Sequence, residues 1–171
     1  VSEAGVGQWE RDTPAQGPGS LALNGMIHDP VRDRVVSVKG LAGGDFVEAI
    51  WTLDASLTWR MHEPAGEQPS PRYGFAYTYD VPNDRLVMLS GAQGGNSFSA
   101  VNPARDLWAL ELETFTWTKL SPEGEPPKGR RNGCWAHDTT HHRLLLWGGT
   151  ADAQTSVKDM IVVDLDPGRE R

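Results

Sequence analysis

The chain has 171 residues, 23% charged and 38% hydrophobic, and this length and composition fit one soluble globular domain rather than a disordered chain. The formal net charge of −7 at pH 7 repels a phosphate backbone, so nucleic acid is not an expected partner. No apolar run reaches the roughly 18 residues of a membrane helix, so no membrane partner is expected either, and the single Cys134 excludes an intrachain disulfide framework.

The first predicted element surrounds Trp9, in the stretch "VGQWERDTP". This stretch resembles "LTWRMHEP" and "FTWTKLSP", which occur later in the chain and each contain a Trp within a strand-like pattern. Residues 1–15 are therefore predicted to form the outer strand of a sheet that belongs to a preceding unit or to a partner chain.

Three similar segments follow: "RVVSVKG" at 34–40, "RLVMLSG" at 85–91 and "RLLLWGG" at 143–149. Each has an Asp five residues before its Arg, at Asp29, Asp80 and Asp138, and the residues between them are typical of a tight turn. Each unit is therefore predicted to open with two antiparallel strands. We expect the glycines after the second strand to permit a sharp turn and a close backbone approach.

A third strand is predicted in "AIWTLD" (49–54), "DLWALEL" (106–112) and "DMIVVDL" (159–165). A fourth strand with a central Trp follows in "LTWRM" (57–61) and "FTWTKL" (115–120), and a Pro-rich connector leads back to the next first strand. Units of four short strands, with 51 and 58 residues between equivalent Asp positions, are typical of propeller blades.

Together, the aliphatic run into Gly-Gly, the "DLW" third strand and the fourth-strand Trp resemble the Kelch-repeat β-propeller family. The resemblance implies an all-β fold with three four-stranded blades per chain, as half of a six-bladed ring. The predicted blades cover 16–66, 67–124 and 125–171, and the third lacks its outer strand. We expect Trp59 and Trp117 to fill the wedges between blades.

Three blades do not close a ring, and two explanations stay open. Two chains form a homodimeric ring, in which the Trp9 strand of each completes the last blade of the other. Alternatively, this is a piece of a longer chain, which Val1 in place of Met favours.

No motif for catalysis, for a cofactor or for a metal site is recognised. The glycines of "GAQGGNS" at 91–97 are interpreted as a loop, since no helix or Lys follows them. We interpret the adjacent His141 and His142 as a solvated turn, and Cys134 as a buried, inert thiol.

The candidate ligand-binding residues lie at the entry to the predicted first strands, which line the channel of a propeller. Their arginines offer forked donors to a carboxylate or phosphate, or they pair with acidic residues of a neighbouring blade. His28, Tyr79 and His137 occupy equivalent strand positions, facing the channel or packed in the core. The candidates are Arg72, Tyr73, Arg130, Arg131, Asn132 and His137, with the loop from Ala92 to Arg105 on the same face.

These patterns favour a non-enzymatic binding module whose loop face holds a protein segment or a small anionic ligand. Two alternatives remain. The resemblance also includes propeller enzymes that act on sugar acids as epimerases or lyases, and the chain can equally be a structural spacer of a larger protein.

Overall fold

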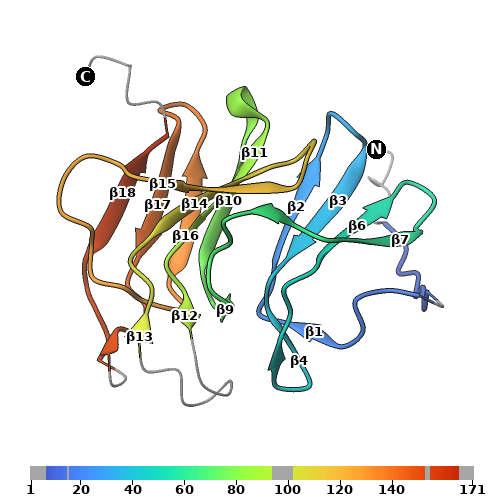
Figure 1. Cartoon of the computed structure of the whole chain (residues 1–171), viewed down its shortest axis with the longest axis horizontal. Helices are drawn as coiled ribbons and strands as arrows, with labels where there is room; N and C mark the ends of the chain where they lie inside the picture. The colour runs from blue at the N-terminus through green and yellow to red at the C-terminus, as the bar shows by residue number, and fades with distance from the viewer. Residues whose placement is uncertain (1–6, 15, 94–101, 153–154, 166–171) are drawn as a thin grey trace, which may run out of the picture.

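The computed structural model describes residues 7–14, 16–93, 102–152 and 155–165, which form an all-β structure (Figure 1). Their strands join into five sheets, three of which lie side by side as blades. Within the described ranges, no helix has the length and hydropathy needed to cross a membrane. The all-β fold predicted from the sequence is therefore confirmed.

Blades 1 and 2 each contain the four antiparallel strands that the repeat predicts, in the spatial order of the chain. Alternating burial along the first strands places apolar side chains on the faces between blades. Blade 1 consists of β2 (Gly25–Asp29), β3 (Arg34–Val38), β6 (Ile50–Asp54) and β7 (Trp59–His62). Blade 2 consists of β10 (Ala76–Asp80), β11 (Arg85–Leu89), β14 (Leu107–Glu111) and β15 (Thr116–Leu120), with η1 (Val81–Asn83) between its first two strands.

Blade 3 is a three-stranded sheet made of β16 (Cys134–Asp138), β17 (Arg143–Trp147) and β18 (Met160–Asp164). Blade 2 gains a further edge strand from the connector, because β8 (Ala65–Gly66) pairs in parallel with β15. The sequence-based boundary at residue 66 places β8 in the first unit, although its hydrogen bonds lie in the sheet of blade 2. The division into 16–66, 67–124 and 125–171 stays a prediction.

Two small sheets lie at the end of the blades that is lowest in Figure 1. We call this end the loop face. The two sheets contain β1 (Leu21–Ala22), β4 (Leu41–Ala42) and β5 (Asp45–Phe46), and β9 (Arg72–Tyr73), β12 (Ala92–Gln93) and β13 (Asn102–Pro103).

The predicted hairpin turns between first and second strands are confirmed by their register and by an ion pair within each. The Asp and the Arg five residues later bond at 2.9 Å in blade 1 and at 2.6 Å in blades 2 and 3. The residue before each Arg has a positive φ, namely Asp33, Asp84 and His142. Such a turn fits the right-handed twist of the paired strands.

A left-handed pair of residues ends each second strand. Its second member is always glycine, with φ of 106° at Gly40, 100° at Gly91 and 96° at Gly149. A Cβ atom at Gly91 would lie 2.9 Å from Cβ of Phe75, so close approach as well as φ requires glycine there. The first member also has a positive φ, yet it is Lys39 in blade 1 and Ser90 in blade 2.

The core consists of two main clusters, each between adjacent blades. Trp117, only 2% exposed, packs in the cluster between blades 1 and 2 with Ile50 and Leu110, which confirms its expected role in that wedge. The second cluster joins blades 2 and 3 through side chains such as Leu107 and Leu146. Blade-to-blade packing is therefore the main source of apolar burial.

Residues 7–14 form no strand and pair with no sheet within the described part of the chain. The Trp9 side chain is fully exposed. That this segment completes a blade of another unit stays a prediction.

Candidate functional site

Arg72 begins the first strand region of blade 2 on the loop face, and its side chain is 1% exposed. Its guanidinium binds the Asp106 carboxylate through two bonds of 2.5 Å and 3.2 Å, and also donates to the Ser90 carbonyl at 3.1 Å. Burial acts to raise the pKa of Asp106, but hydrogen bonds from Arg72 and Trp108 outweigh burial and the net pKa is lowered. Arg72 is therefore fully occupied inside blade 2.

Arg130 repeats this arrangement in blade 3. Its guanidinium binds Asp159 at 2.6 Å and 3.1 Å and donates to the Gly148 carbonyl at 3.2 Å. The hydrogen bond from Arg130 lowers the pKa of Asp159. Both acids stand directly before the third strand of the same blade as their arginine, not in a neighbouring blade as the alternative interpretation held.

The two arginines therefore correct one expectation. Neither presents a forked donor to solvent at a channel mouth, because both are 1% exposed and hold the first and third strands of a blade together. A bidentate pair of this kind fixes the geometry of the chain more firmly than a single bond. Their pattern in the sequence, an Arg before the first strand and an Asp before the third, is a structural device.

Tyr73, Arg131 and Asn132 lie close together on the loop face. Arg131 donates to the Tyr73 hydroxyl, and its guanidinium carbon lies 5.8 Å from the centre of the Tyr73 ring. Asn132 is exposed, and its backbone N–H donates to the Gly74 carbonyl at 2.8 Å. Of the three arginines predicted to bind a ligand, Arg131 is the partly exposed one. The loop from Ala92 to Arg105 lies outside the described residues over 94–101.

His137 is half-buried, and its Nε2 has no hydrogen-bond partner among the described residues. Burial lowers the pKa of His137, and so does the charge of His142, whose ring centre lies 6.1 Å away. The two equivalent positions differ from it. His28 is exposed, whereas Tyr79 donates to Asp84 at 3.0 Å, so that burial and this bond raise the pKa of Tyr79 to about 12.

Two further expectations are wrong. His142 does not lie in a solvated turn: it is 7% exposed, and its Nε2 lies 2.8 Å from Oδ1 of Asp80 in blade 2. Only the neighbouring His141 is exposed. Cys134 is an exposed thiol rather than a buried one. No cluster of three or more metal-ligating side chains occurs among the described residues.

Sequence reasoning missed the outer face of blade 3, an apolar surface with no cover in this chain. Trp147, Met160 and Val162 on it are 51%, 53% and 51% exposed. Strand register places six side chains on this face: Cys134, Ala136, Leu145, Trp147, Met160 and Val162. The equivalent positions of blade 2 form its contact with blade 3: Ala76, Thr78, Val87, Leu89, Leu107 and Ala109.

Blade 1 has a matching uncovered face on its opposite side. Met26 and Met61 on this face are 47% and 55% exposed. Its other apolar members, Trp51, Leu53 and Trp59, are equivalent by register to Trp108, Leu110 and Trp117, which pack against blade 1 from blade 2. The period-2 pattern of each strand, compared across the three units, is the sequence signal that identifies both faces.

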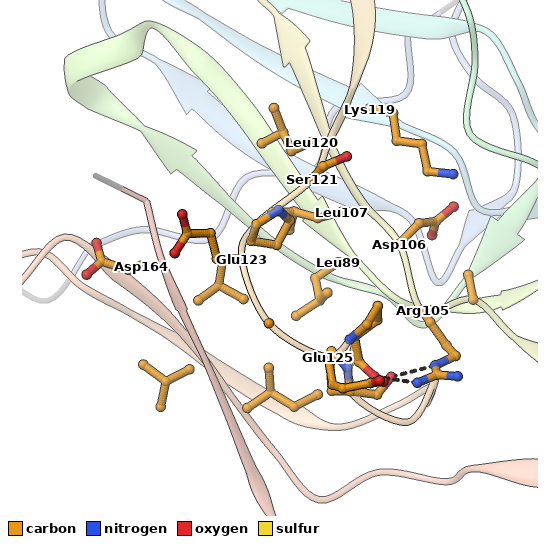
Figure 2. Close-up of a pocket in the computed structure, with 18 of the residues that line it drawn as sticks. Leu89, Arg105, Asp106, Leu107, Lys119, Leu120, Ser121, Glu123, Glu125 and Asp164 are labelled. Carbon is orange, nitrogen blue, oxygen red and sulfur yellow. Dashed lines mark hydrogen bonds between the residues drawn. The ribbon is translucent and has the colours of Figure 1, made fainter. Parts of the chain in front are cut away.

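A cavity of about 870 Å³ lies between the Pro-rich connector of blade 2 and the outer edge of blade 3 (Figure 2). Leu89, Leu107 and Leu120 provide apolar lining, and Glu123 and Glu125 lie on the connector. Arg105 holds the connector in place by donating to the carbonyl oxygens of Pro126 and Pro127, the latter at 2.9 Å.

Comparison with known proteins agrees with this geometry. Residues 31–169 match the family model described as the KLHDC2/KLHL20/DRC7 Kelch-repeats domain. Dynein regulatory complex subunit 7 of Chlamydomonas reinhardtii is 31% identical over 61% of this chain and 8% of its own length. Serine/threonine-protein phosphatase BSL2 of Arabidopsis thaliana is 30% identical over 70% of this chain and 12% of its own length.

A solved structure titled "Structure of YjhT" superposes with a TM-score of 0.65 and 20% identity over 88% of this chain and 44% of that chain. At this identity the likeness shows the fold alone, and the fold is that of a β-propeller. The chain belongs to the Kelch-repeat family. It spans only a small part of the length of its relatives and less than half of the structure that it resembles.

Proposed function

We propose that this chain is a non-enzymatic interaction module, a partial Kelch propeller whose two uncovered blade faces bind further blades. A second copy of the chain supplies these blades in a closed homodimeric ring, or the remainder of a longer chain supplies them. One observation supports both versions. The outer faces of blades 1 and 3 carry, at equivalent positions, the side chains that form the blade interfaces inside the chain.

The two faces are complementary because a propeller interface always joins unlike faces of successive blades. The outer face of blade 3 corresponds to the blade 2 side of the blade 2–blade 3 contact, and the outer face of blade 1 corresponds to the blade 2 side of the blade 1–blade 2 contact. Blade 3 of one copy therefore fits blade 1 of the other. Closure at both junctions would create an apolar interface of the obligate class, above about 2,000 Å².

Light scattering and charged substitutions test this assembly. The ring predicts a mass in solution of about twice 18.7 kDa. Trp147→Arg on blade 3 and Met26→Arg on blade 1 place a charge in the junction and should each give monomers. Val31→Arg, at a 66% exposed turn position outside both faces, is the matched control and should stay dimeric. A wild-type chain that is monomeric at micromolar concentration would contradict the homodimer.

We further propose that the loop face binds a protein segment or a small anionic ligand through Arg131, together with Tyr73 and Asn132. Arg131 is supported by its partial exposure beside an aromatic ring, an arrangement that suits a carboxylate or a phosphate. Arg72, Arg130 and His137 would act indirectly, by shaping this face.

Titration of the ¹⁵N-labelled chain with inorganic phosphate and with a hexaglutamate peptide tests the loop face. Saturable shifts at the amide signals of Arg131 and Asn132, lost in Arg131→Gln, are expected. Arg105→Gln, which removes an exposed arginine bonded to the connector, is the control and should keep the shifts. Shifts that persist in Arg131→Gln, or turnover of a sugar acid by the chain, would overturn the assignment as a simple binding face.

A further inference from the structure

The outermost complete strand of blade 2 occupies a slot with two walls. On one side β15 pairs antiparallel with β14, and Trp117 stands opposite Leu110. On the other side β15 pairs in parallel with β8, and Trp117 stands opposite Gly66. A Cβ atom at Gly66 would lie 2.8 Å from the Trp117 carbonyl oxygen, so glycine is required there by the strand inside the slot.

Blade 3 has both walls of the same slot. The first wall is β18, whose outer edge pairs with no described residue. The second wall is the connector segment "PEGEPP", which repeats "PAGEQP" around β8 and places Glu123 and Gly124 at the positions of Ala65 and Gly66. Gly124 has φ of 95°, comparable to 78° at Gly66. However, a Cβ atom at Gly124 would meet no described heavy atom within 4 Å.

The space between these walls is the cavity of about 870 Å³. Its lining joins the connector, the edge of β18 and the apolar side chains between blades 2 and 3 (Figure 2). Leu107 in the lining is equivalent to Ile50, which belongs to the cluster that contains Trp117. The cavity thus has the shape and the apolar wall to receive an extended strand with one Trp.

The chain itself contains a segment that matches this slot. From the fourth-strand Trp to the start of the next first strand, the distance is 17 residues from Trp59 to Ala76 (76 − 59) and 17 from Trp117 to Cys134 (134 − 117). From Trp9 to Gly25 it is 16 (25 − 9). Trp9 is fully exposed, so no contact inside the described chain accounts for this large apolar side chain.

We propose that the cavity is a strand socket and that its occupant is the segment around Trp9 of a second copy. The proposal rests on the ring assembly proposed above and deepens it by naming the contact that completes blade 3. By equivalence with blade 2, Trp9 lies opposite Val163 in antiparallel pairing and opposite Gly124 in parallel pairing. Backbone hydrogen bonds to two edges give affinity, and the Trp pocket gives specificity.

An engineered disulfide tests the register. Glu10 and Val162 are predicted to be directly opposite, both with side chains turned away from the cavity, at a separation that a disulfide can bridge. With Cys134→Ser as background, Glu10→Cys with Val162→Cys should give a covalent dimer of about twice 18.7 kDa. Glu10→Cys with Val81→Cys, at a 59% exposed position on η1, is the control and should stay monomeric on a non-reducing gel. Equal cross-linking of both pairs, an intrachain disulfide or no disulfide would overturn the proposal.

A peptide experiment separates the socket from the ring. A fluorescent peptide of residues 7–16 should bind the full chain carrying Trp9→Ala, and the same peptide with Trp9→Ala should not. Gly124→Asn should weaken binding about tenfold or more, because its side chain enters the slot. Gly43→Asn, at another positive-φ glycine with nothing within 4 Å, is the control. Peptide binding by a monomeric chain leaves the socket standing and shows that its occupant is not a second copy, which overturns that assignment. A dimer that ignores the peptide overturns the socket but not the ring.

Discussion

Nε2 of His142 in blade 3 lies 2.8 Å from Oδ1 of Asp80 in blade 2, and both side chains are buried. Asp80 also holds its own hairpin through Arg85 at 2.6 Å. The carboxylate therefore joins two blades at the turn edge, where His142 occupies the left-handed turn position. In the first junction the equivalent turn residue, Asp84, bonds back to Arg32 of blade 1 at 2.7 Å. A polar contact from the turn of one blade to the turn of the preceding blade occurs at both junctions.

Replacing His142 by Asn should destabilise the junction between blades 2 and 3. Asn tolerates the left-handed backbone but does not reach Asp80, so we expect a loss of about 1–2 kcal/mol in the free energy of unfolding. Urea denaturation measures the loss. His141→Asn, at an exposed neighbouring position, should change it by no more than about 0.5 kcal/mol. Equal effects of the two substitutions would contradict a specific role for the His142 contact.

Arg72→Ala should be strongly destabilising, because it leaves Asp106 without its bidentate partner in a mostly buried position. We expect a cost of about 3 kcal/mol or more. Arg60→Ala removes an exposed arginine that lies 3.9 Å from Asp54, and should cost less than about 1 kcal/mol. Thermal unfolding of both variants is the measurement. If Arg72→Ala unfolds like the wild type, the structural role assigned to Arg72 is wrong.

Ser90→Ala tests the unusual serine in the left-handed pair. The Ser90 hydroxyl accepts the Arg130 backbone N–H at 2.8 Å and lies 2.8 Å from the carbonyl oxygens of Ala104 and Arg130. Its loss leaves buried backbone groups unpaired, and we expect a cost of about 1–3 kcal/mol in chemical denaturation. Ser56→Ala, at an exposed serine bonded within its own turn, is the comparison and should have a much smaller effect.

Stability should fall in two steps as the pH is lowered. Burial and the charge of His142 lower the pKa of His137, so the folded chain favours the neutral imidazole, and its contribution is lost as the pH falls below the usual His value of about 6.5. The net pKa of Asp80 and of Asp106 is also lowered, since hydrogen bonds outweigh burial. Their contribution is present above the usual Asp pKa of about 3.9 and is lost below it.

Urea midpoints at pH 7.5, 5 and 3 measure both steps. His137→Gln should abolish the decrease between pH 7.5 and 5 while keeping the decrease toward pH 3. A midpoint that is constant from pH 7.5 to 5 in the wild type would show that His137 does not favour its neutral form in the folded chain.

The repeat made the fold predictable from particular residues. The Asp–Arg spacing at Asp29, Asp80 and Asp138 predicted the hairpins, and the Trp at residue 117 predicted the wedge between blades 1 and 2. The candidate site was less predictable. Arg72 and Arg131 look alike in sequence, yet one is buried against Asp106 and the other is partly exposed beside Tyr73. The distinction depends on partners 34 and 58 residues away, which a local pattern does not contain.

The sequence by itself determined the strands, their order within a blade and the turns, because alternation, glycine and hairpin chemistry are local properties of the chain. Only the tertiary structure decided which charged groups are buried, as with His142 and Arg130, and which apolar faces stay uncovered. Burial and pairing are set by neighbours that are distant along the chain. The cavity beside β18 is such a property: it exists because two walls from different blades meet around a place that no described strand fills.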